Sequence, residues 1–136
     1  MKLLMIYCNN FYYKPVTKTL ETVEDRTEAM EFDNVLVGFI HAEAEDEQDF
    51  NGVEKKLVKN LKWAAKKNNT NKVVLHSFAH LSESKASAEF TIELFDKTEA
   101  RMKNANYETW QTAFGYFMDL KINAPGYSLA RIYKSF

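Results

Sequence analysis

The residues with most chemical potential lie in VVLHSFAHLS, residues 73–82, where His76 and His80 are four positions apart. A histidine pair with this spacing can bind zinc when a second pair of Cys or His ligands completes the site. The remaining candidates, His41 and Cys8, form no such pair in the sequence. We therefore expect no metal site and no cofactor in this domain.

Cys8 is the only cysteine, and with a histidine it would supply the minimum for a cysteine hydrolase. It ends the apolar run KLLMIYC, residues 2–8, where a lone thiol is usually a small buried hydrophobe. The sequence has no Gly-x-Ser-x-Gly elbow, Walker loop or dinucleotide-binding glycine pattern. It therefore offers no obvious protein nucleophile.

His80 follows Phe78 and Ala79 just after an apolar strand-like run. In α/β proteins, the carboxyl ends of strands commonly expose binding groups. A small residue such as Ala79 lets a ligand approach the main-chain amides, which can stabilise a carbonyl oxygen as it gains negative charge. Local context leaves two interpretations open for His80, a structural histidine or a site residue.

The elements that must position these residues alternate between strands and helices. From Gly52, apolar residues recur every three and four positions, which predicts a helix ending near Asn68. Pro15 suggests that one early strand lies at a sheet edge. We expect strands at 2–8, 11–17, 34–42, 72–78, 108–114 and 115–124, a second helix over 84–104, loop or weak helix over 18–33, loop after 42, a turn at 123–127 and a last extended segment over 127–136.

Length and composition predict one domain, residues 1–136, because 46% apolar and 14% aromatic residues can form a single core. The chain stops directly after an extended segment, which suggests a domain cut from a longer protein. The single cysteine indicates a reducing compartment. MKLLMIYC is too short for a signal peptide, and no segment approaches the roughly 20 apolar residues of a membrane helix. We expect a cytoplasmic protein without membrane association.

Charge is segregated along the chain although the net charge is −1. Residues 1–50 carry 11 acidic and 4 basic side chains, whereas residues 51–136 carry 8 acidic and 14 basic ones. Much of the excess lies in KKLVKNLKWAAKK, residues 55–67. Such a stretch is either a solvated helix face or a face that contacts phosphates.

Two motifs carry a family resemblance: FAHLS at 78–82 and FGYFMDLKI at 114–122. With the order of the other elements, they make the chain similar over nearly its whole length to the N-terminal editing domain of archaeal threonyl-tRNA synthetases. That domain resembles the D-aminoacyl-tRNA deacylases in fold. The resemblance implies an α/β fold in two layers, with helices packed on a mixed, largely antiparallel sheet.

The activity that the resemblance implies is proofreading hydrolysis of mischarged L-seryl-tRNA(Thr). Serine lacks one methyl group of threonine, and one methyl gives only about 10 to 200-fold discrimination in a binding pocket, so a second, hydrolytic site is needed. The implied mechanism is RNA-assisted, with the vicinal ribose hydroxyl positioning or activating the water. The implied partners are the 3′ aminoacyl end of tRNA(Thr), a second copy in a homodimer, and the catalytic domain of the same synthetase.

The resemblance also implies roles for particular residues. Aromatic rings in two facing walls could stack on the terminal adenine. The expected catalytic residues are His80, Ala79 through its backbone, Tyr116 and Met118. The expected substrate-binding residues are Phe78, Ala113, Phe114, Gly115, Phe117, Cys8 and Arg131.

The sequence departs from the family pattern at Met118, where the family has a lysine. Lys121 is not a simple replacement, because residues three apart in a strand point to opposite faces. Arg131 stands where the family tends to place a glutamate, and Cys8 and Asn9 replace an expected Ser and Asp. Three accounts stay open: compensation by another cation such as Lys85 or Arg131, catalysis by backbone and RNA alone, or weakened activity.

Two alternative functions also stay open. A D-aminoacyl-tRNA deacylase would act on the D-amino acid ester with the same fold. A non-catalytic tRNA-binding or dimerisation module would retain the fold and lack the chemistry.

Overall fold

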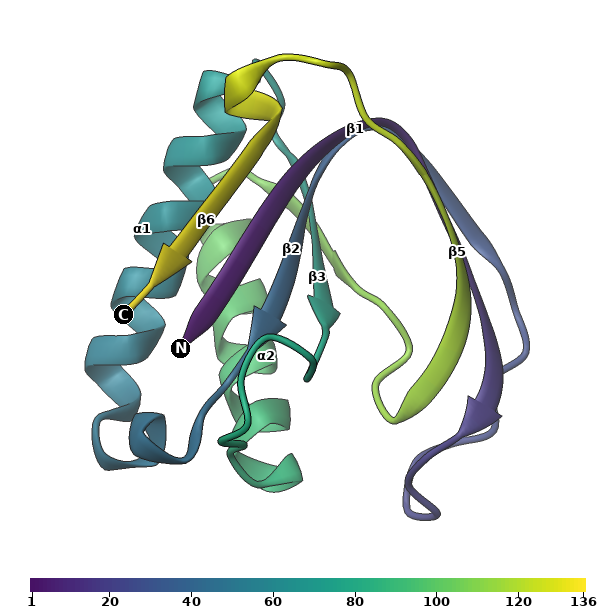
Figure 1. The fold of residues 1–136 in the computed structure, drawn as a ribbon, viewed down its shortest axis with the longest axis vertical. Helices are drawn as coiled ribbons and strands as arrows, with labels where there is room; N and C mark the ends of the chain where they lie inside the picture. The colour runs from purple at the N-terminus through teal and green to yellow at the C-terminus, as the bar shows by residue number, and fades with distance from the viewer.

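A single long strand organises the sheet in the computed structural model, which describes all of residues 1–136. Strand β1, Lys2–Lys18, pairs antiparallel with β2, Met30–His41, from Lys2↔His41 to Tyr13↔Met30. On its other edge, β1 pairs first with β6, Arg131–Ser135, and then with β5, Tyr116–Asn123, both antiparallel. The first and last strands therefore lie side by side (Figure 1).

Two parallel strands complete the sheet. Strand β3, Lys72–Ser77, lies parallel to β2, and β4, Glu108–Gln111, lies parallel to β3. The order is β4-β3-β2-β1-β5, with β6 also paired to β1. The expected mixed sheet is confirmed; its three antiparallel pairings all involve β1.

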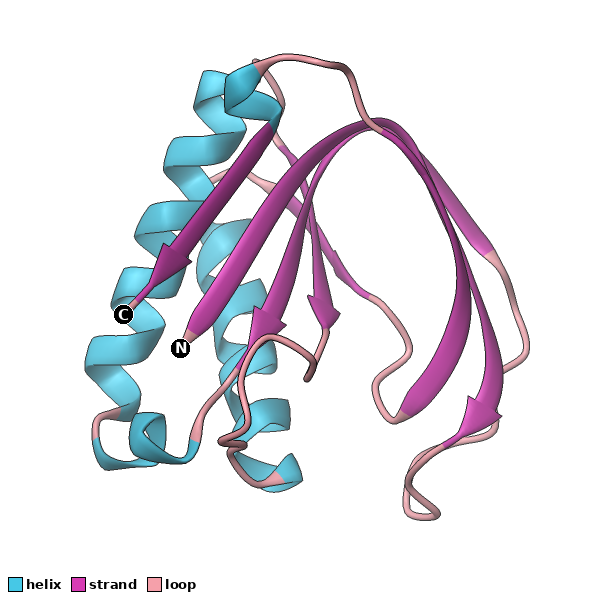
Figure 2. Cartoon of the chain, in the orientation of Figure 1, coloured by secondary structure: helices cyan, strands magenta, loops and turns pink.

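Two helices cover one face of the sheet (Figure 2). Helix α1, Phe50–Lys67, starts where the Asp49 side chain accepts a hydrogen bond from the Gly52 N–H, and α2, Ala88–Asn104, starts at a matching cap on Ser87. Short 3₁₀ turns occupy Ala44–Gln48 and Ser128–Ala130. Neither helix has the length and apolar content that crossing a bilayer requires.

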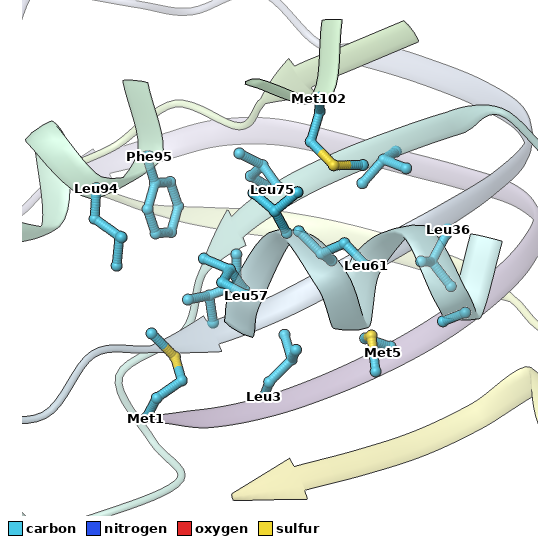
Figure 3. Close-up of a cluster of buried hydrophobic side chains, with 14 of the residues drawn as sticks. Met1, Leu3, Met5, Leu36, Leu57, Leu61, Leu75, Leu94, Phe95 and Met102 are labelled. Carbon is cyan, nitrogen blue, oxygen red and sulfur yellow. The ribbon is translucent and has the colours of Figure 1, made fainter. Parts of the chain in front are cut away.

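The larger core lies between the helices and the sheet. Figure 3 shows Leu57 and Leu61 of α1 among the strand side chains Leu3 and Met5, with residues of α2 alongside. A smaller core occupies the opposite face of the sheet. Its buried members are Cys8, Phe11, Tyr13, Phe32, Val35, Val37, Phe39, Val74 and Ala113.

The sheet bends sharply over the smaller core. In β1, Cys8 and Phe11 both face this core although they are three residues apart, so the strand alternation shifts by one between them. Opposite, Asn34 of β2 has a left-handed backbone with φ of 51°. The outer half of β1 and all of β5 therefore arch over the smaller core (Figure 1).

Several predicted boundaries are corrected. Separate strands at 2–8 and 11–17 are wrong, because Asn10 pairs with Asp33 and carries the ladder through the bend. The second helix starts at Ala88 rather than residue 84, because the Ser84 carbonyl bonds to His41 at the end of β2 and the Ala86 N–H bonds to the Ala42 carbonyl. Strand β4 ends at Gln111, and the last extended segment begins at Arg131.

Candidate functional site

A cleft of about 540 Å³ opens where β2 and β3 end and β5 begins. Because β2 and β3 are parallel, their carboxyl ends meet at the same sheet edge, and the arch of β5 closes the other side. The structure brings nine predicted site residues to this cleft. They are Phe78, Ala79, His80, Ala113, Phe114, Gly115, Tyr116, Phe117 and Met118.

The wall after β3 presents unoccupied main-chain donors. The Phe78 N–H still bonds the Ile40 carbonyl, at 3.0 Å, and continues the pairing of β3 with β2. The chain then turns, and the amides of Ala79 and His80 make no main-chain hydrogen bond. Both residues are exposed. Free main-chain N–H groups at this position can donate hydrogen bonds to a negatively charged oxygen.

His41 holds this wall in place from the end of β2. Its Nδ1 accepts the Leu81 N–H at 3.0 Å, so Nε2 carries the proton and donates to the Ser84 carbonyl at 2.7 Å. The side chain is only 1% exposed. Both ring nitrogens are therefore used to fix the loop that follows Ala79 and His80.

Glu43 ties the same loop to the start of the chain. Its carboxylate accepts the Ser82 hydroxyl at 2.7 Å and the Met1 ammonium at 2.7 Å, and Lys2 lies 3.2 Å away. These partners, the Met1 ammonium first, lower the pKa of Glu43 to about 2. The sequence reasoning missed Glu43 and treated His41 only as a metal ligand. The available signal was their position: His41 ends β2 and Glu43 follows it, and β2 lies parallel to β3, the strand that leads into FAHLS.

The two histidines of VVLHSFAHLS have different environments. His80 is exposed, and its ring lies 5.0 Å from that of Phe78. His76 is buried; its Nδ1 lies 2.9 Å from Thr112 Oγ1, and its ring packs edge-on against Phe39. Burial lowers the pKa of His76 to about 4, so the imidazole is neutral near pH 7.

The opposite wall begins at a glycine that the backbone requires. Gly115 has φ of +82°, and its carbonyl accepts the Thr19 N–H at 2.7 Å. A Cβ there would lie 2.9 Å from Val23 Cγ1. The Tyr116 ring lines the cleft, while its hydroxyl donates to the Glu24 carbonyl and accepts the Arg26 N–H. Tyr116 thus fastens the 19–29 loop to this wall.

Strand alternation in β5 follows the predicted parity. Tyr116, Met118 and Leu120 pack against the smaller core, whereas Phe117 is 62% exposed. Lys121 lies outside the cleft, with its Nζ 4.8 Å from the Tyr12 ring centroid. Lys121 therefore does not take the place of a lysine at Met118.

The cleft contains one lysine and no carboxylate. Lys85 is the only Lys or Arg among the lining residues, which include no Asp or Glu. Arg131 is not among them and lies exposed on β6, paired with Ile6. Lys85, in contrast to Arg131, is therefore placed to act on a ligand in the cleft.

Cys8 does not reach the cleft either. Its side chain is fully buried in the smaller core, and this burial raises the pKa of the thiol to about 12. A thiol with that pKa stays protonated and is a poor nucleophile. A cysteine-hydrolase mechanism therefore has no support in this geometry.

Fold and site define a class of protein: a small α/β domain with an apolar, amide-bearing cleft at the carboxyl edge of its parallel strands. Comparison with known proteins gives the family. The archaea-specific editing domain of threonyl-tRNA synthetase matches residues 1–136, and the chain belongs to this family. The resemblance based on FAHLS and FGYFMDLKI is confirmed.

Individual relatives agree. The chain is 29% identical over 135 residues to the threonine–tRNA ligase of Thermococcus sibiricus, covering 97% of this chain and 22% of that protein. It is 30% identical over 134 residues to that of Methanococcus maripaludis, covering 97% and 21%. The chain thus spans about a fifth of the length of these relatives.

A solved structure supports the fold. The c-Myc DNA Unwinding Element Binding Protein matches with a TM-score of 0.65 and 12% identity, covering 100% of this chain and 99% of that one. At this identity the likeness concerns the fold alone. It extends over the whole chain.

Proposed function

We propose that the cleft hydrolyses the ester of mischarged L-seryl-tRNA(Thr). Membership of the editing-domain family supports this function, and the observation that carries it is the pair of free amides at Ala79 and His80 in a cleft without a carboxylate or thiolate. Such a site has donors for a developing oxyanion but no obvious nucleophile of its own. It suits a reaction in which water attacks and the RNA assists.

In the proposed reaction, a water oxygen bonds to the ester carbonyl carbon, and the carbonyl oxygen becomes an oxyanion held by the amides of Ala79 and His80. The oxyanion then re-forms the carbonyl double bond as the bond to the ribose oxygen breaks, the ribose oxygen takes the proton that the attacking water releases, and serine and tRNA(Thr) leave. The vicinal ribose hydroxyl positions the water. His80 is exposed beside Phe78 and contributes a polar group to the edge of the cleft. In this mechanism it is not the sole general base.

Lys85 supplies the positive charge that Met118 does not. It is the only Lys or Arg of the cleft, and its ammonium forms no salt bridge within the chain. The α-ammonium of an aminoacyl ester would repel it, whereas the phosphate of the terminal nucleotide would attract it. Lys85 therefore anchors the RNA rather than the amino acid.

A deacylation assay tests the proposed function. Purified chain is mixed with L-seryl-tRNA(Thr), L-threonyl-tRNA(Thr) and a D-aminoacyl-tRNA(Thr), and release of each amino acid is followed. We expect rapid release of L-serine and sparing of L-threonine. Preferential release of the D-amino acid would instead indicate a D-aminoacyl-tRNA deacylase, consistent with the deacylase-like fold that we propose for the chain.

The uncharged Met118 favours one further candidate, a non-catalytic module that binds the tRNA end. Such a module would bind a non-hydrolysable seryl-adenosine analogue and release neither amino acid. We further propose that the chain acts in the cytoplasm, with the catalytic domain of its own synthetase and as a homodimer. Sedimentation of the chain alone tests the dimer.

A further inference from the structure

A basic groove lies along the outer face of α1 and includes one residue of α2, Arg101. It is defined here by Lys55, Val58, Lys59, Lys62, Trp63, Lys66 and Arg101. Its volume is about 440 Å³. It shares no residue with the cleft, and α1 and β5 lie on opposite sides of the molecule (Figure 1). The groove is therefore a separate feature of the surface.

The positive charge of the groove is hardly neutralised within the chain. No Asp or Glu lines it, and none of the lysines of α1 forms a salt bridge. The one acidic residue of α1, Glu54, is buried and binds Arg101 Nε at 2.7 Å. Four lysine charges therefore face solvent without a partner.

The spacing of these lysines is unfavourable for the helix itself. Lys55, Lys59, Lys62 and Lys66 follow one another at intervals of four, three and four residues, the spacing at which like charges repel on a helix. Helix α2 shows the alternative, because it mixes acidic and basic residues and pairs Glu99 with Lys103. A helix face can be well solvated with mixed charges, as in α2, so solvation does not explain a row of lysines without acidic residues. A polyanion is the ligand whose charge complements such a row.

Trp63 points to a nucleic acid rather than an acidic protein. Its side chain is 40% exposed in the groove, with Lys67 Nζ at 5.9 Å and Lys134 Nζ at 5.7 Å from the ring centroid. An exposed aromatic ring among cations is the arrangement that binds stacked bases beside a phosphate backbone. An acidic peptide would use the lysines and leave the ring unused.

We propose that the basic groove binds the phosphate backbone of the tRNA whose aminoacyl end enters the cleft. The choice of tRNA rests on the proposed function. The groove would hold the RNA by charge while the cleft examines the ester. Affinity then depends on α1, and chemistry depends on the cleft.

The test measures the affinity of the chain for uncharged tRNA(Thr) at increasing KCl. Each phosphate contact contributes about 0.7 to 0.9 to the log–log slope, so K55Q/K59Q/K62Q/K66Q should lower the slope by about 3 and weaken binding at low salt at least tenfold. The charge-preserving K55R/K59R/K62R/K66R should bind like the wild type. In W110F, where Trp63 is the only tryptophan, tRNA should quench the fluorescence.

A matched control removes four lysine charges elsewhere, as K14Q/K72Q/K97Q/K121Q. If this control weakens binding as much as the groove variant, net charge and not the groove binds RNA, and the inference is overturned. Competition by polyglutamate as strong as that by tRNA would overturn the choice of RNA.

Hydrolysis of seryl-adenosine separates this inference from the proposed function, because that substrate has no RNA backbone. If the wild type cleaves seryl-adenosine but the salt dependence of tRNA affinity is unchanged when the α1 lysines are replaced, the groove inference is overturned and the proposed function is supported. If no seryl ester is cleaved while the slope still depends on these lysines, the function fails and the groove stands.

Discussion

His76 and Cys8 are titratable groups that burial holds in their neutral forms near pH 7. His76 lines the cleft, whereas Cys8 lies in the smaller core. The neutral state of His76 has a measurable consequence for stability, because an unfolded histidine takes up a proton at higher pH than the folded one.

We predict that the free energy of unfolding falls as pH drops from about 6.5 toward 4, because the unfolded chain binds a proton that folded His76 does not. The stability that depends on neutral His76 is fully present above the pKa of the unfolded histidine, and about 3 kcal/mol of it is lost once the pH has fallen below the folded pKa. Urea titrations across this range measure it. His76→Asn should flatten this part of the profile, whereas His80→Ala should leave it; equal slopes for wild type and His76→Asn would contradict the assignment.

Lys85→Gln should raise KM for seryl-tRNA(Thr) by about tenfold with little change in kcat, because one charge-assisted contact to phosphate is lost. Lys85→Arg should restore KM. Lys97→Gln, on α2 outside the cleft, is the matched control. An unchanged KM for Lys85→Gln in steady-state deacylation would mean that the cleft works without a cation.

At the scale of elements, the end of β2, the segment that follows it and the loop after β3 form one unit. His41 and Glu43 bind residues about 40 positions later, and the Ala42 carbonyl accepts the Ala86 N–H at 3.0 Å. Hydrogen bonds from His41, Ala42 and Glu43 therefore hold the loop that presents the Ala79 and His80 amides.

Glu43→Gln should destabilise the chain by about 1–3 kcal/mol, since it weakens charge-assisted bonds to Met1 and Ser82. It should also lower kcat by loosening the loop. The pKa of Glu43 is depressed to about 2, so its contribution is present above the ordinary carboxylate pKa near 4.5 and is lost as pH falls toward 2. Thermal unfolding at pH 3 and pH 7 checks this. Exposed Glu45→Gln should change neither stability nor kcat.

The two walls of the cleft could be predicted from the sequence because each consists of residues of a recognisable motif, FAHLS or FGYFMDLKI. Strand alternation then predicts which side chains of β5 share a face. The sequence reasoning missed the continuity of β1, because Asn9 and Asn10 look like a turn and nothing local shows that Asn10 pairs with Asp33. It also missed the clamp by His41, since hydrogen bonds between residues about 40 positions apart leave no local pattern.

At the scale of the whole molecule, the bend at Asn34 divides the sheet into one part that packs against the helices and another that borders the cleft. The part under α1 and α2 contains the larger core, which carries most of the buried apolar side chains. The β5 side of the arch, with Thr19 and Leu20 after β1, lines one wall of the cleft. The chain can therefore present an open, amide-bearing site without exposing its main core.

In the proposed mechanism, main-chain amides and the RNA together carry out the hydrolysis. Single-turnover serine release from seryl-tRNA(Thr) tests it most directly, comparing tRNA ending in adenosine with tRNA ending in 2′-deoxyadenosine, on wild type and His80→Ala. We predict that the deoxy end slows release by about 100-fold or more, whereas His80→Ala costs less than the roughly 100-fold typical of losing a general base. A small effect of the deoxy end together with a larger loss in His80→Ala would contradict the account.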